Sequence, residues 1–376
     1  MPEAAARQAL QPSRRILIAG GGTGGHLMPA LAIAAALREL DPSVEPVLVG
    51  AERGVEARIL PTRDFRYHLL PSEPIYRRTW WKNVRWPFIA ARLLRQISRL
   101  FAEERPVAVL GTGGYASGPV VWWAARHGIP TAVQEQNAYP GLATRWLSRR
   151  VRQVYLGLPE ARQLLHFGPH TEAVDTGNPI APPTPERRAD AVARLGLGGV
   201  AGRPVVLVTG GSQGALALNR AVAGVLDAGG FGNAVLLWVT GRGTHDQFAR
   251  YHRPPGVQVI DFLDPMADGY AVADLVVSRA GMITVAELCA WGLPSILVPL
   301  PTAAADHQTH NARVLAQARA SELLIQSEVT PARLRERVLE LLADRARREA
   351  MAHAAAARGR PQASRDIASR LLTLAA

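Results

Sequence analysis

The sequence predicts an α/β protein built from two Rossmann-like domains. Apolar strand-like runs alternate with helix-length stretches along the chain, a pattern typical of a parallel sheet with crossover helices. Two runs lead into similar glycine turns, ILIAGGGTGG at residues 16–25 and VVLVTGGSQG at residues 205–214. The Pro-rich stretch Asn178–Pro185 lies between the two series of runs and predicts a domain boundary there.

Each run has the length and apolar character of a buried strand. The first series is expected at Ile16–Ala19, Val44–Val49, Val107–Leu110 and Thr131–Val133. The second is expected at Val205–Thr209, Ala234–Thr240, Val257–Ile260, Leu275–Val277 and Ser295–Val298. The Ala-, Leu- and Arg-rich tail from Pro331 onward has helical spacing and is broken at Gly359–Pro361. We therefore expect a flexible segment at 1–13, domains at 14–178 and 179–345, and helices at 346–376 that pack back across the domains.

Composition is that of ordinary globular protein, with 48% hydrophobic and 20% charged residues in 376. No apolar run reaches the roughly 18 residues of a spanning helix, and no signal peptide is evident, so a cytoplasmic protein is expected. Cys289 is the only cysteine, which excludes an internal disulfide and fits a small core residue in a reducing compartment. The net charge of +12 predicts an anionic partner: nucleic acid, a phosphorylated ligand or a lipid surface.

The glycine turns predict phosphate binding. A glycine-rich turn between a strand and a helix lets backbone N–H groups approach a phosphate, and the helix N-terminus adds partial positive charge. Gly20, Gly22 and Gly25 also satisfy the GxGxxG spacing of nicotinamide enzymes, with Glu52 as the ribose-binding acid. Such an enzyme needs one loop, whereas this chain has two. The pair favours a nucleotide-diphosphate ligand and its acceptor, with the nicotinamide enzyme as the alternative.

His26 follows the first glycine turn directly. In the first turn of a helix, the dipole disfavours the imidazolium and keeps the ring neutral, which is the state of a general base. A packing or capping histidine is the alternative.

The motifs form an ordered set over nearly the whole chain. They are GGGTGGH (20–26), GTGGYASGP (111–119), QEQN (134–137), GNP (177–179), GGSQGA (210–215), SRAGMITVAE (278–287) and HQTHNA (307–312). Together they resemble the MurG family, the N-acetylglucosaminyltransferases that convert lipid I to lipid II in peptidoglycan synthesis. The resemblance implies GT-B architecture, with two Rossmann-like parallel-sheet domains facing a cleft, the acceptor mostly in the N-terminal domain and the UDP-sugar mostly in the C-terminal one.

The resemblance also implies residue roles. A carboxylate suits the ribose diol, so Glu287 is expected to accept from the ribose hydroxyls, while the amide of Gln308 reads the sugar hydroxyls. Ser212 is expected at the diphosphate, and Tyr115 and Ser117 on the acceptor side. The remaining expected substrate contacts are Thr23, Gly24, Gly25, Asn137, Leu263, Met282, Ile283, Thr284, Val285 and Ala286.

Two positions depart from the family pattern. The family usually has His at Gln134, and Arg at Ala181, two positions past the GNP proline. A charge-assisted contact such as that Arg supplies is worth about 1.5–3 kcal/mol. Arg187, Arg188, Arg279 or the helix dipole behind Ser212 are the candidate replacements.

Residues Tyr76–Leu100 hold seven basic side chains, no acidic ones and three of the eight tryptophans. Basic and aromatic residues in this mixture are typical of a segment that lies on an anionic membrane surface. At about 1 kcal/mol per basic residue, the seven supply at most about 7 kcal/mol. The alternative for residues 89–100 is an amphipathic helix packed on the sheet, and both can hold. Nucleic-acid binding is not expected, because no nucleic-acid motif accompanies the charge.

The expected reaction is a single displacement, and the resemblance implies inversion with a β-1,4 link to the C4 hydroxyl of the muramyl sugar. His26 is the first candidate for the base, and Glu135 the second. Neither cofactor nor metal is expected, because there is no DxD triplet and no tight cluster of His and carboxylate residues. Diffuse aspartates such as Asp264 and Asp268 are the alternative metal ligands. The expected location is the cytoplasmic side of the inner membrane, as a peripheral protein. A UDP-sugar epimerase, a nicotinamide oxidoreductase and a non-catalytic membrane scaffold are the rival functions.

Overall fold

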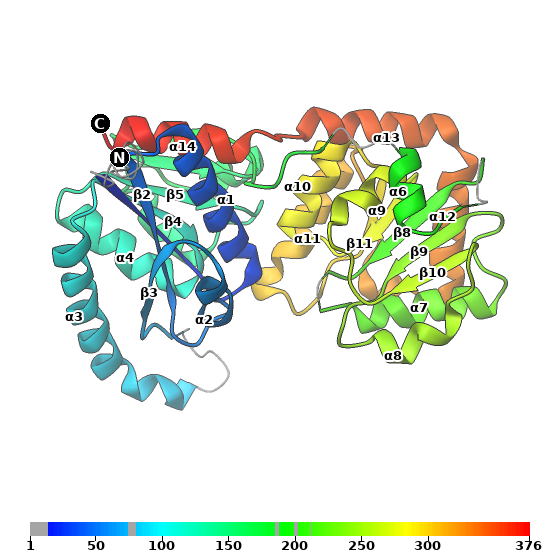
Figure 1. Cartoon of the computed structure of the whole chain (residues 1–376), viewed down its shortest axis with the longest axis horizontal. Coiled ribbons are helices and arrows are strands. Elements are labelled where there is room, and N and C mark those ends of the chain that lie inside the picture. Colours follow the sequence, from blue (N-terminus) through cyan, green and yellow to red (C-terminus); the bar gives the residue numbers. More distant parts are fainter. Residues whose placement is uncertain (1–13, 74–79, 185–187, 199–201, 212) are drawn as a thin grey trace, which may run out of the picture. The chain divides into compact units, whose positions relative to one another are not determined.

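The computed structural model describes residues 14–73, 80–184, 188–198, 202–211 and 213–376. The chain forms two compact units (Figure 1). The first comprises the described residues up to Ile180 together with Gln362–Ala376, and the second comprises Ala181–Pro361. Each unit is a parallel sheet with helices, so the predicted α/β class is confirmed.

The first unit has a seven-stranded sheet in the order β3-β2-β1-β4-β5-β6-β7. Its strands are β1 (Arg14–Gly20), β2 (Val44–Ala51), β3 (Arg66–Leu70), β4 (Ala108–Gly113), β5 (Thr131–Glu135), β6 (Gln153–Leu156) and β7 (Glu172–Asp175). Its helices are α1 (Gly24–Leu40), α2 (Glu56–Ile59), α3 (Trp86–Glu104), α4 (Gly114–Arg126), α5 (Leu142–Leu147) and α14 (Ala363–Leu374), with 3₁₀ turns at Leu60–Thr62, Trp80–Arg85 and Pro159–Leu164.

Both faces of this sheet are buried, which explains why β1 reads as a continuous apolar run. Ile16 and Ile18 pack with residues of α1 and α14, whereas Leu17 and Ala19 pack with residues of α3 and α4. The alternation follows from the two-residue period of a strand. The final helix, α14, therefore completes the core of the first unit, where it packs against α1 (Figure 1).

The second unit has a six-stranded sheet in the order β10-β9-β8-β11-β12-β13. Its strands are β8 (Val205–Thr209), β9 (Val235–Val239), β10 (Val257–Ile260), β11 (Leu275–Ser278), β12 (Ser295–Leu297) and β13 (Glu322–Leu323). Its helices are α6 (Arg188–Arg194), α7 (Leu216–Asp227), α8 (His245–Phe248), α9 (Met266–Val272), α10 (Met282–Trp291), α11 (His307–Gln317), α12 (Pro331–Ala343) and α13 (Arg345–Arg358), with 3₁₀ turns at Ala249–Tyr251, Ala304–Asp306 and Gln326–Glu328.

In each sheet the chain first builds strands to one side of its first strand and then crosses to the other side. The order reverses between β1 and β4 in the first unit and between β8 and β11 in the second. In open parallel sheets, ligands bind outside the carboxyl ends of the strands at such a reversal. Both predicted glycine turns leave a strand at this point: residues 20–25 follow β1, and residues 210–214 follow β8.

Candidate functional site

The glycine turn of the first unit lies at the β1/β4 reversal with its tip exposed. Thr23, Gly24 and Gly25 are exposed, and α1 begins at Gly24. The base of the turn is held by a hydrogen bond from Gly21 N to Gly113 O, 3.2 Å. Gly114 has a φ of +80°, and a Cβ there would lie 1.7 Å from Gly21 O, so only glycine fits at this crossing. The turn thus exposes its backbone at the N-terminus of a helix.

A buried glutamate supports the same turn, and the sequence analysis missed it. Glu56 has no exposed surface, and its Oε1 accepts hydrogen bonds from Gly22 N at 2.5 Å and Ala51 N at 3.4 Å. Its other oxygen, Oε2, is buried without a hydrogen-bond partner among the described residues. A Cβ at Gly21 would lie 1.5 Å from Glu56 Oε1. The signal for this role was an acid in a short glycine-containing loop after β2, which is weak by itself.

His26 is oriented by β4. Its Nδ1 lies 3.1 Å from Thr112 O, and Thr112 Oγ1 donates to His26 O at 2.9 Å. Because a carbonyl oxygen can only accept, Nδ1 carries the hydrogen, and Nε2 of the neutral ring is then the basic nitrogen. His26 is half-buried. This tautomer is the one that a general base beside the loop requires.

Glu135, in contrast, is enclosed by its own loop. The residue is 2% exposed. Its Oε1 accepts from Asn137 N at 3.0 Å and from Asn137 Nδ2 at 3.3 Å, and its Oε2 accepts from Gly141 N at 2.9 Å. Both oxygens are therefore engaged in shaping the turn that presents Asn137 at the carboxyl end of β5. Asn137 itself is half-buried.

Gln134, which stands where the family usually has histidine, belongs to a buried amide network. Gln134 Nε2 donates to Asn178 Oδ1 at 2.9 Å, and Gln136 Nε2 lies 2.5 Å from both Gln134 Oε1 and Thr112 O. Asn178 Nδ2 closes the network by donating to Gln136 O at 3.0 Å. Thr112 O therefore accepts hydrogen bonds from both Gln136 and His26, which connects this network to the candidate base.

The two residues expected on the acceptor side differ in exposure. Tyr115 is half-buried in the first turn of α4, and its ring lies against Gly22, where a Cβ would come within 2.6 Å of Tyr115 Cε1. Ser117 is 2% exposed and donates to Gly114 O at 3.3 Å within its own helix. Tyr115 is thus part of the wall of the glycine turn, whereas the Ser117 hydroxyl faces its helix backbone.

In the second unit, α10 begins at Met282, after a three-residue link from the end of β11 at the β8/β11 reversal. Gly281 is its N-cap residue, and Met282 and Val285 face the core. Ile283, Thr284, Ala286 and Glu287 are half-buried. Ser212, expected at the diphosphate, lies outside the described residues. The described parts of its loop, Gly210–Gly211 and Gln213–Gly214, follow β8 directly.

Glu287 is held by Tyr270 of α9. Tyr270 Oη donates to Glu287 Oε2 at 2.7 Å. Burial raises the pKa of the Glu287 carboxyl above its ordinary value, and the hydrogen bond from Tyr270 opposes that rise. Burial also raises the pKa of Tyr270, with the adjacent Glu287 charge adding to it. Tyr270 therefore fixes one carboxylate oxygen and leaves Oε1 as the acceptor for a ligand.

Gln308 and Leu263 are tied to loops at the carboxyl ends of other strands. Gln308 Oε1 accepts from Leu300 N at 3.0 Å, which leaves the amide nitrogen as a donor. Leu263 follows β10 and packs against α9, where a Cβ at Gly269 would come within 2.7 Å of its Cδ2. Both residues are half-buried.

Two arginines considered as replacements for the one missing at Ala181 have other partners. Arg279 Nη1 donates to Val298 O and Pro299 O at 3.2 and 3.1 Å, and its Nη2 donates to Gln326. Burial lowers the pKa of Arg279. Arg188 makes a two-pronged ion pair with Asp274 at 3.1 and 2.7 Å. Arg187 lies outside the described residues.

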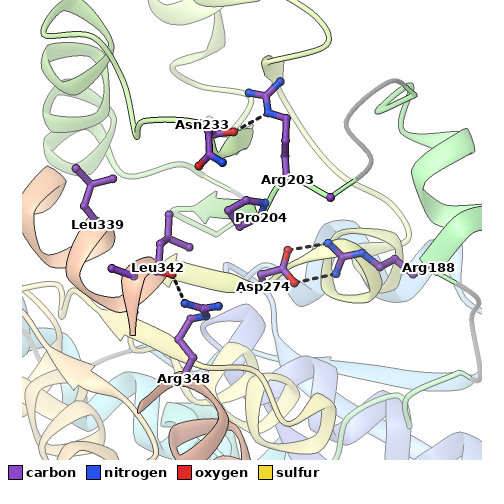
Figure 2. Close-up of a pocket in the computed structure, with 10 residues that line it drawn as sticks. Arg188, Arg203, Pro204, Asn233, Asp274, Leu339, Leu342 and Arg348 are labelled. Atoms are coloured by element: carbon purple, nitrogen blue, oxygen red, sulfur yellow. Dashed lines mark hydrogen bonds and ion pairs between the residues drawn. The ribbon is translucent and has the colours of Figure 1, made fainter. Parts of the chain in front are cut away.

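Arg188 also lies at the amino-terminal edge of the sheet, opposite to the edge that carries the glycine loop. It lines a cavity of about 650 Å³ together with Arg203, Asp274 and Arg348 (Figure 2). Asp274 Oδ2 accepts from Val205 N at 2.7 Å, which places the cavity at the amino end of β8. The glycine loop starts at the other end of this strand, roughly 13 Å away at about 3.3 Å per residue. The cavity is therefore separate from the candidate site.

Potential metal ligands gather away from the glycine loops. Among the described residues, the one group of three is His68, Glu103 and Glu104. Glu104 is already paired with Arg66 at 2.8 Å and Arg15 at 3.2 Å, so cationic side chains occupy the position of an ion. In the second unit, Asp268 is 4% exposed and pairs with Arg194 at 2.6 Å.

The basic aromatic segment combines a packed and an exposed face. Residues 74–79 lie outside the described chain. The later part of α3 packs on the sheet through Leu93, Ile97 and Leu100, as the alternative for residues 89–100 predicted. Before it, Trp81, Val84 and Phe88 are 58%, 69% and 81% exposed. No helix in the described ranges is long and apolar enough to cross a bilayer.

Comparisons with known proteins cover both units. Residues 16–156 match the glycosyltransferase family 28 N-terminal domain, and residues 205–371 match its C-terminal domain. The chain is 39% identical over 362 residues to the UDP-N-acetylglucosamine–N-acetylmuramyl-(pentapeptide) pyrophosphoryl-undecaprenol N-acetylglucosamine transferase of Salinibacter ruber, covering 96% of each chain. It is also 39% identical to the transferase of the same name from Moorella thermoacetica, covering 94% of this chain and 97% of that one. A solved structure of MurG from Acinetobacter baumannii is similar with a TM-score of 0.78 and 27% identity, over 96% of this chain and 99% of that one.

Proposed function

Since this chain belongs to glycosyltransferase family 28, and within it to the MurG family, we propose that it transfers N-acetylglucosamine from UDP-N-acetylglucosamine to the muramyl sugar of lipid I, giving lipid II. The predicted GT-B fold class is confirmed by its two parallel-sheet α/β domains and by the family match. The observation that carries the proposal is near-full-length similarity to these transferases, together with a glycine turn at the β1/β4 reversal and another at the β8/β11 reversal. A nicotinamide enzyme would need only the first turn.

The proposed reaction is a single displacement with inversion. The C4 hydroxyl oxygen of the muramyl sugar attacks the anomeric carbon of N-acetylglucosamine, and a β-1,4 bond forms. The hydroxyl proton passes to Nε2 of His26. The bond from the anomeric carbon to the UDP oxygen breaks, and its electron pair leaves with the diphosphate.

His26 is the proposed base because its hydrogen bond to Thr112 O fixes the required tautomer. Glu135 has three hydrogen-bond donors on its two oxygens, which supports a role in holding the loop of Asn137 rather than in taking a proton. The second glycine loop, with Ser212, would stabilise the charge that develops on the diphosphate, an effect worth about 3 kcal/mol per donor. We propose that the step uses no metal, since the backbone amides of the second glycine loop and the N-terminus of the helix that follows it supply the positive charge.

The substrate contacts are proposed in two groups. Glu287 Oε1 would accept from the ribose, with Leu263 and residues 282–286 around the uridine and Gln308 on the sugar hydroxyls. The exposed tip at Thr23, Gly24 and Gly25, with Asn137, would contact the donor sugar from the first unit, and Tyr115 the acceptor. The half-buried positions of most of these side chains support the assignment, because each combines a fixed orientation with an accessible surface.

The first test is turnover of a lipid I analogue at saturating UDP-N-acetylglucosamine. His26→Ala should lower kcat at least a hundredfold, in line with the roughly 10²–10⁴-fold contribution of a general base. His127→Ala is the matched control, because this exposed histidine of the same unit stacks on Trp123 at the far end of α4. Wild-type turnover of His26→Ala would refute the proposal that His26 is the base. Absence of UDP release by the wild-type enzyme in the presence of both substrates would refute the proposed function.

We further propose that the first unit docks on an anionic membrane surface through residues 76–100, as a peripheral protein of the cytoplasmic face, and binds no nucleic acid. The exposed Trp81, Val84 and Phe88 would enter the interface while nearby basic residues contact the headgroups. Arg85 and Arg92 have the acidic neighbours Glu73 and Glu52 at 3.7 and 3.4 Å, so the total attraction falls below the sum over seven cations.

The membrane proposal is tested with vesicles that contain anionic lipid. Phe88→Ser, or charge reversal of Arg77, Arg78, Lys82 and Arg85 together, should reduce sedimentation of the protein with the vesicles. Arg345→Glu on α13 is the control, since it reverses an exposed charge in the second unit. Equal binding of all variants would contradict the proposal, and retention on an oligonucleotide would indicate the nucleic-acid alternative.

A further inference from the structure

The loss of the family arginine at Ala181 leaves open which side chain faces the diphosphate, and the loops at the carboxyl edge of the second sheet supply a candidate. We propose that Arg242 is the cationic contact for the diphosphate of a nucleoside diphosphate bound at the β8/β11 reversal. This inference rests on the proposed function, because it takes UDP as the ligand of that site. Arg242 follows β9 and was not singled out in the sequence.

The loop of Arg242 is packed directly against the glycine loop after β8. Gly241 has a φ of +84°, and a Cβ there would lie 2.2 Å from Gly214 Cα. A Cβ at Gly214 would in turn lie 2.2 Å from Thr240 O. Because the two backbones touch and consecutive Cα atoms are about 3.8 Å apart, Arg242 begins one residue away from the predicted phosphate loop.

A buried asparagine holds the two loops together. Asn219 is in the first turn of α7, the helix that follows the glycine loop, and has no exposed surface. Its Nδ2 donates to Thr240 O at 2.8 Å and to Thr244 Oγ1 at 3.0 Å, while its Oδ1 accepts from Trp238 Nε1 at 3.0 Å. The position of the Arg242 backbone relative to the start of α7 is therefore fixed by three hydrogen bonds.

The Arg242 guanidinium is available for an anion. It is exposed and lies over the ring of Phe262, with its Cζ 4.2 Å from the ring centroid. No described acidic side chain forms an ion pair with it, in contrast to Arg188 and Arg194 of the same unit. Stacking on an aromatic face orients the plane of a guanidinium and leaves its edge N–H groups free to bind phosphate oxygens in pairs.

Phe262 places this cation between the two ends of the proposed ligand. It precedes Leu263, the proposed uridine contact, and Arg242 stands beside the proposed diphosphate loop. One stacked pair would thus span from the nucleoside to the diphosphate. As UDP leaves, the additional negative charge would fall on the phosphate oxygens that the guanidinium contacts, so the contact strengthens in the transition state.

The test compares binding of UDP and of uridine by titration calorimetry, which does not depend on activity. Arg242→Gln should weaken UDP binding between about tenfold and a hundredfold, as expected for loss of a charge-assisted contact, and should leave uridine binding within twofold. Arg242→Lys keeps the charge but not the two-pronged geometry, so its UDP affinity should lie between those of wild-type and Arg242→Gln. The matched control is Arg250→Gln, which removes another exposed arginine that lies over an aromatic ring, Tyr251, in the same unit.

Each outcome has one meaning. Wild-type protein that fails to bind UDP refutes the proposed function itself. If wild-type binds UDP and Arg242→Gln binds it equally well, this inference is wrong and the proposed function stands. If Arg242→Gln weakens uridine and UDP to the same extent, Arg242 acts by positioning Phe262 and the diphosphate contact is likewise refuted.

Discussion

Replacing Glu56 by alanine removes the buried carboxylate beneath the first glycine turn. The charge-assisted hydrogen bond from Gly22 N, 2.5 Å long, is worth about 1.5–3 kcal/mol, and the longer contact from Ala51 N adds about 0.5 kcal/mol. The small cavity left behind costs about 1 kcal/mol more. Against these losses, the substitution also removes the unpartnered Oε2, whose burial costs about 1–3 kcal/mol. The expected net loss of stability is about 2 kcal/mol.

Glu56→Gln removes the charge of this side chain but keeps an acceptor oxygen, so it separates the two contributions to stability. An amide oxygen can still accept from Gly22 N but without the charge, so the expected loss is about 1 kcal/mol, half that of alanine. Glu52→Ala is the control, because among the described side chains this nearby exposed acid makes only a long surface ion pair, with Arg92 at 3.4 Å. Its loss should not exceed about 0.5 kcal/mol.

The assay is urea denaturation combined with amide hydrogen exchange of a peptide that covers residues 20–27. Exchange should be fastest in Glu56→Ala, slower in Glu56→Gln and slowest in wild-type, because the hydrogen bond that protects Gly22 N–H is lost in the first variant and weakened in the second. kcat/KM should show the opposite ranking, lowest in Glu56→Ala and highest in wild-type, since the turn presents Thr23, Gly24 and Gly25. Exchange in Glu56→Ala equal to that in wild-type would refute the reasoning, as would an equal effect of Glu52→Ala.

Two further predictions concern the second unit. Tyr270→Phe removes the hydrogen bond that opposes the burial-induced rise in the pKa of Glu287, so this pKa should rise further and UDP affinity should begin to fall at a higher pH than in wild-type. Calorimetry between pH 5 and 8 measures this shift, with Tyr251→Phe, which removes a hydroxyl bonded to Asp227, as the control; identical pH profiles of Tyr270→Phe and wild-type would contradict the prediction. Cys289 is 6% exposed, and burial raises the pKa of its thiol to about 11. The folded protein should therefore react with an aromatic disulfide reagent far more slowly than protein unfolded in urea. Fast stoichiometric labelling of native protein would show that Cys289 is accessible.

The central strands were predictable because burial on both faces of a parallel sheet produces an apolar run without interruption. The runs beginning at Ile16, Val44, Thr131 and Val205 are confirmed as β1, β2, β5 and β8. The strands β3, β6, β7 and β13 were not predicted. The edge strand β3 begins with the exposed Arg66 and Tyr67, and the edge strand β7 has exposed ends at Glu172 and Asp175. Strands that are polar on one side and only four or five residues long do not differ from loops in composition.

The site was predictable to the extent that function depends on local sequence. A glycine turn with a hydroxyl residue and a following helix is contiguous, so both turns could be located from the chain alone. Glu56 and Arg242 escaped notice because their importance depends on contacts made across the sheet edge. Glu56 meets Gly22, 34 residues earlier, and the Arg242 loop meets Gly214. No periodicity or spacing in a single sequence encodes such a meeting.

The two departures from the family pattern are tolerated for different structural reasons. Gln134 replaces histidine within an amide network in which each neighbour, Gln136 and Asn178, supplies or accepts one hydrogen bond, so a neutral side chain satisfies the site. Ala181 removes a charge, and a charge can be replaced from any loop that reaches the same phosphate. The two substitutions therefore make different demands: the first requires a partner of matching geometry on adjacent strands, whereas the second requires only a cation at the carboxyl edge of the sheet, where Arg242 stands.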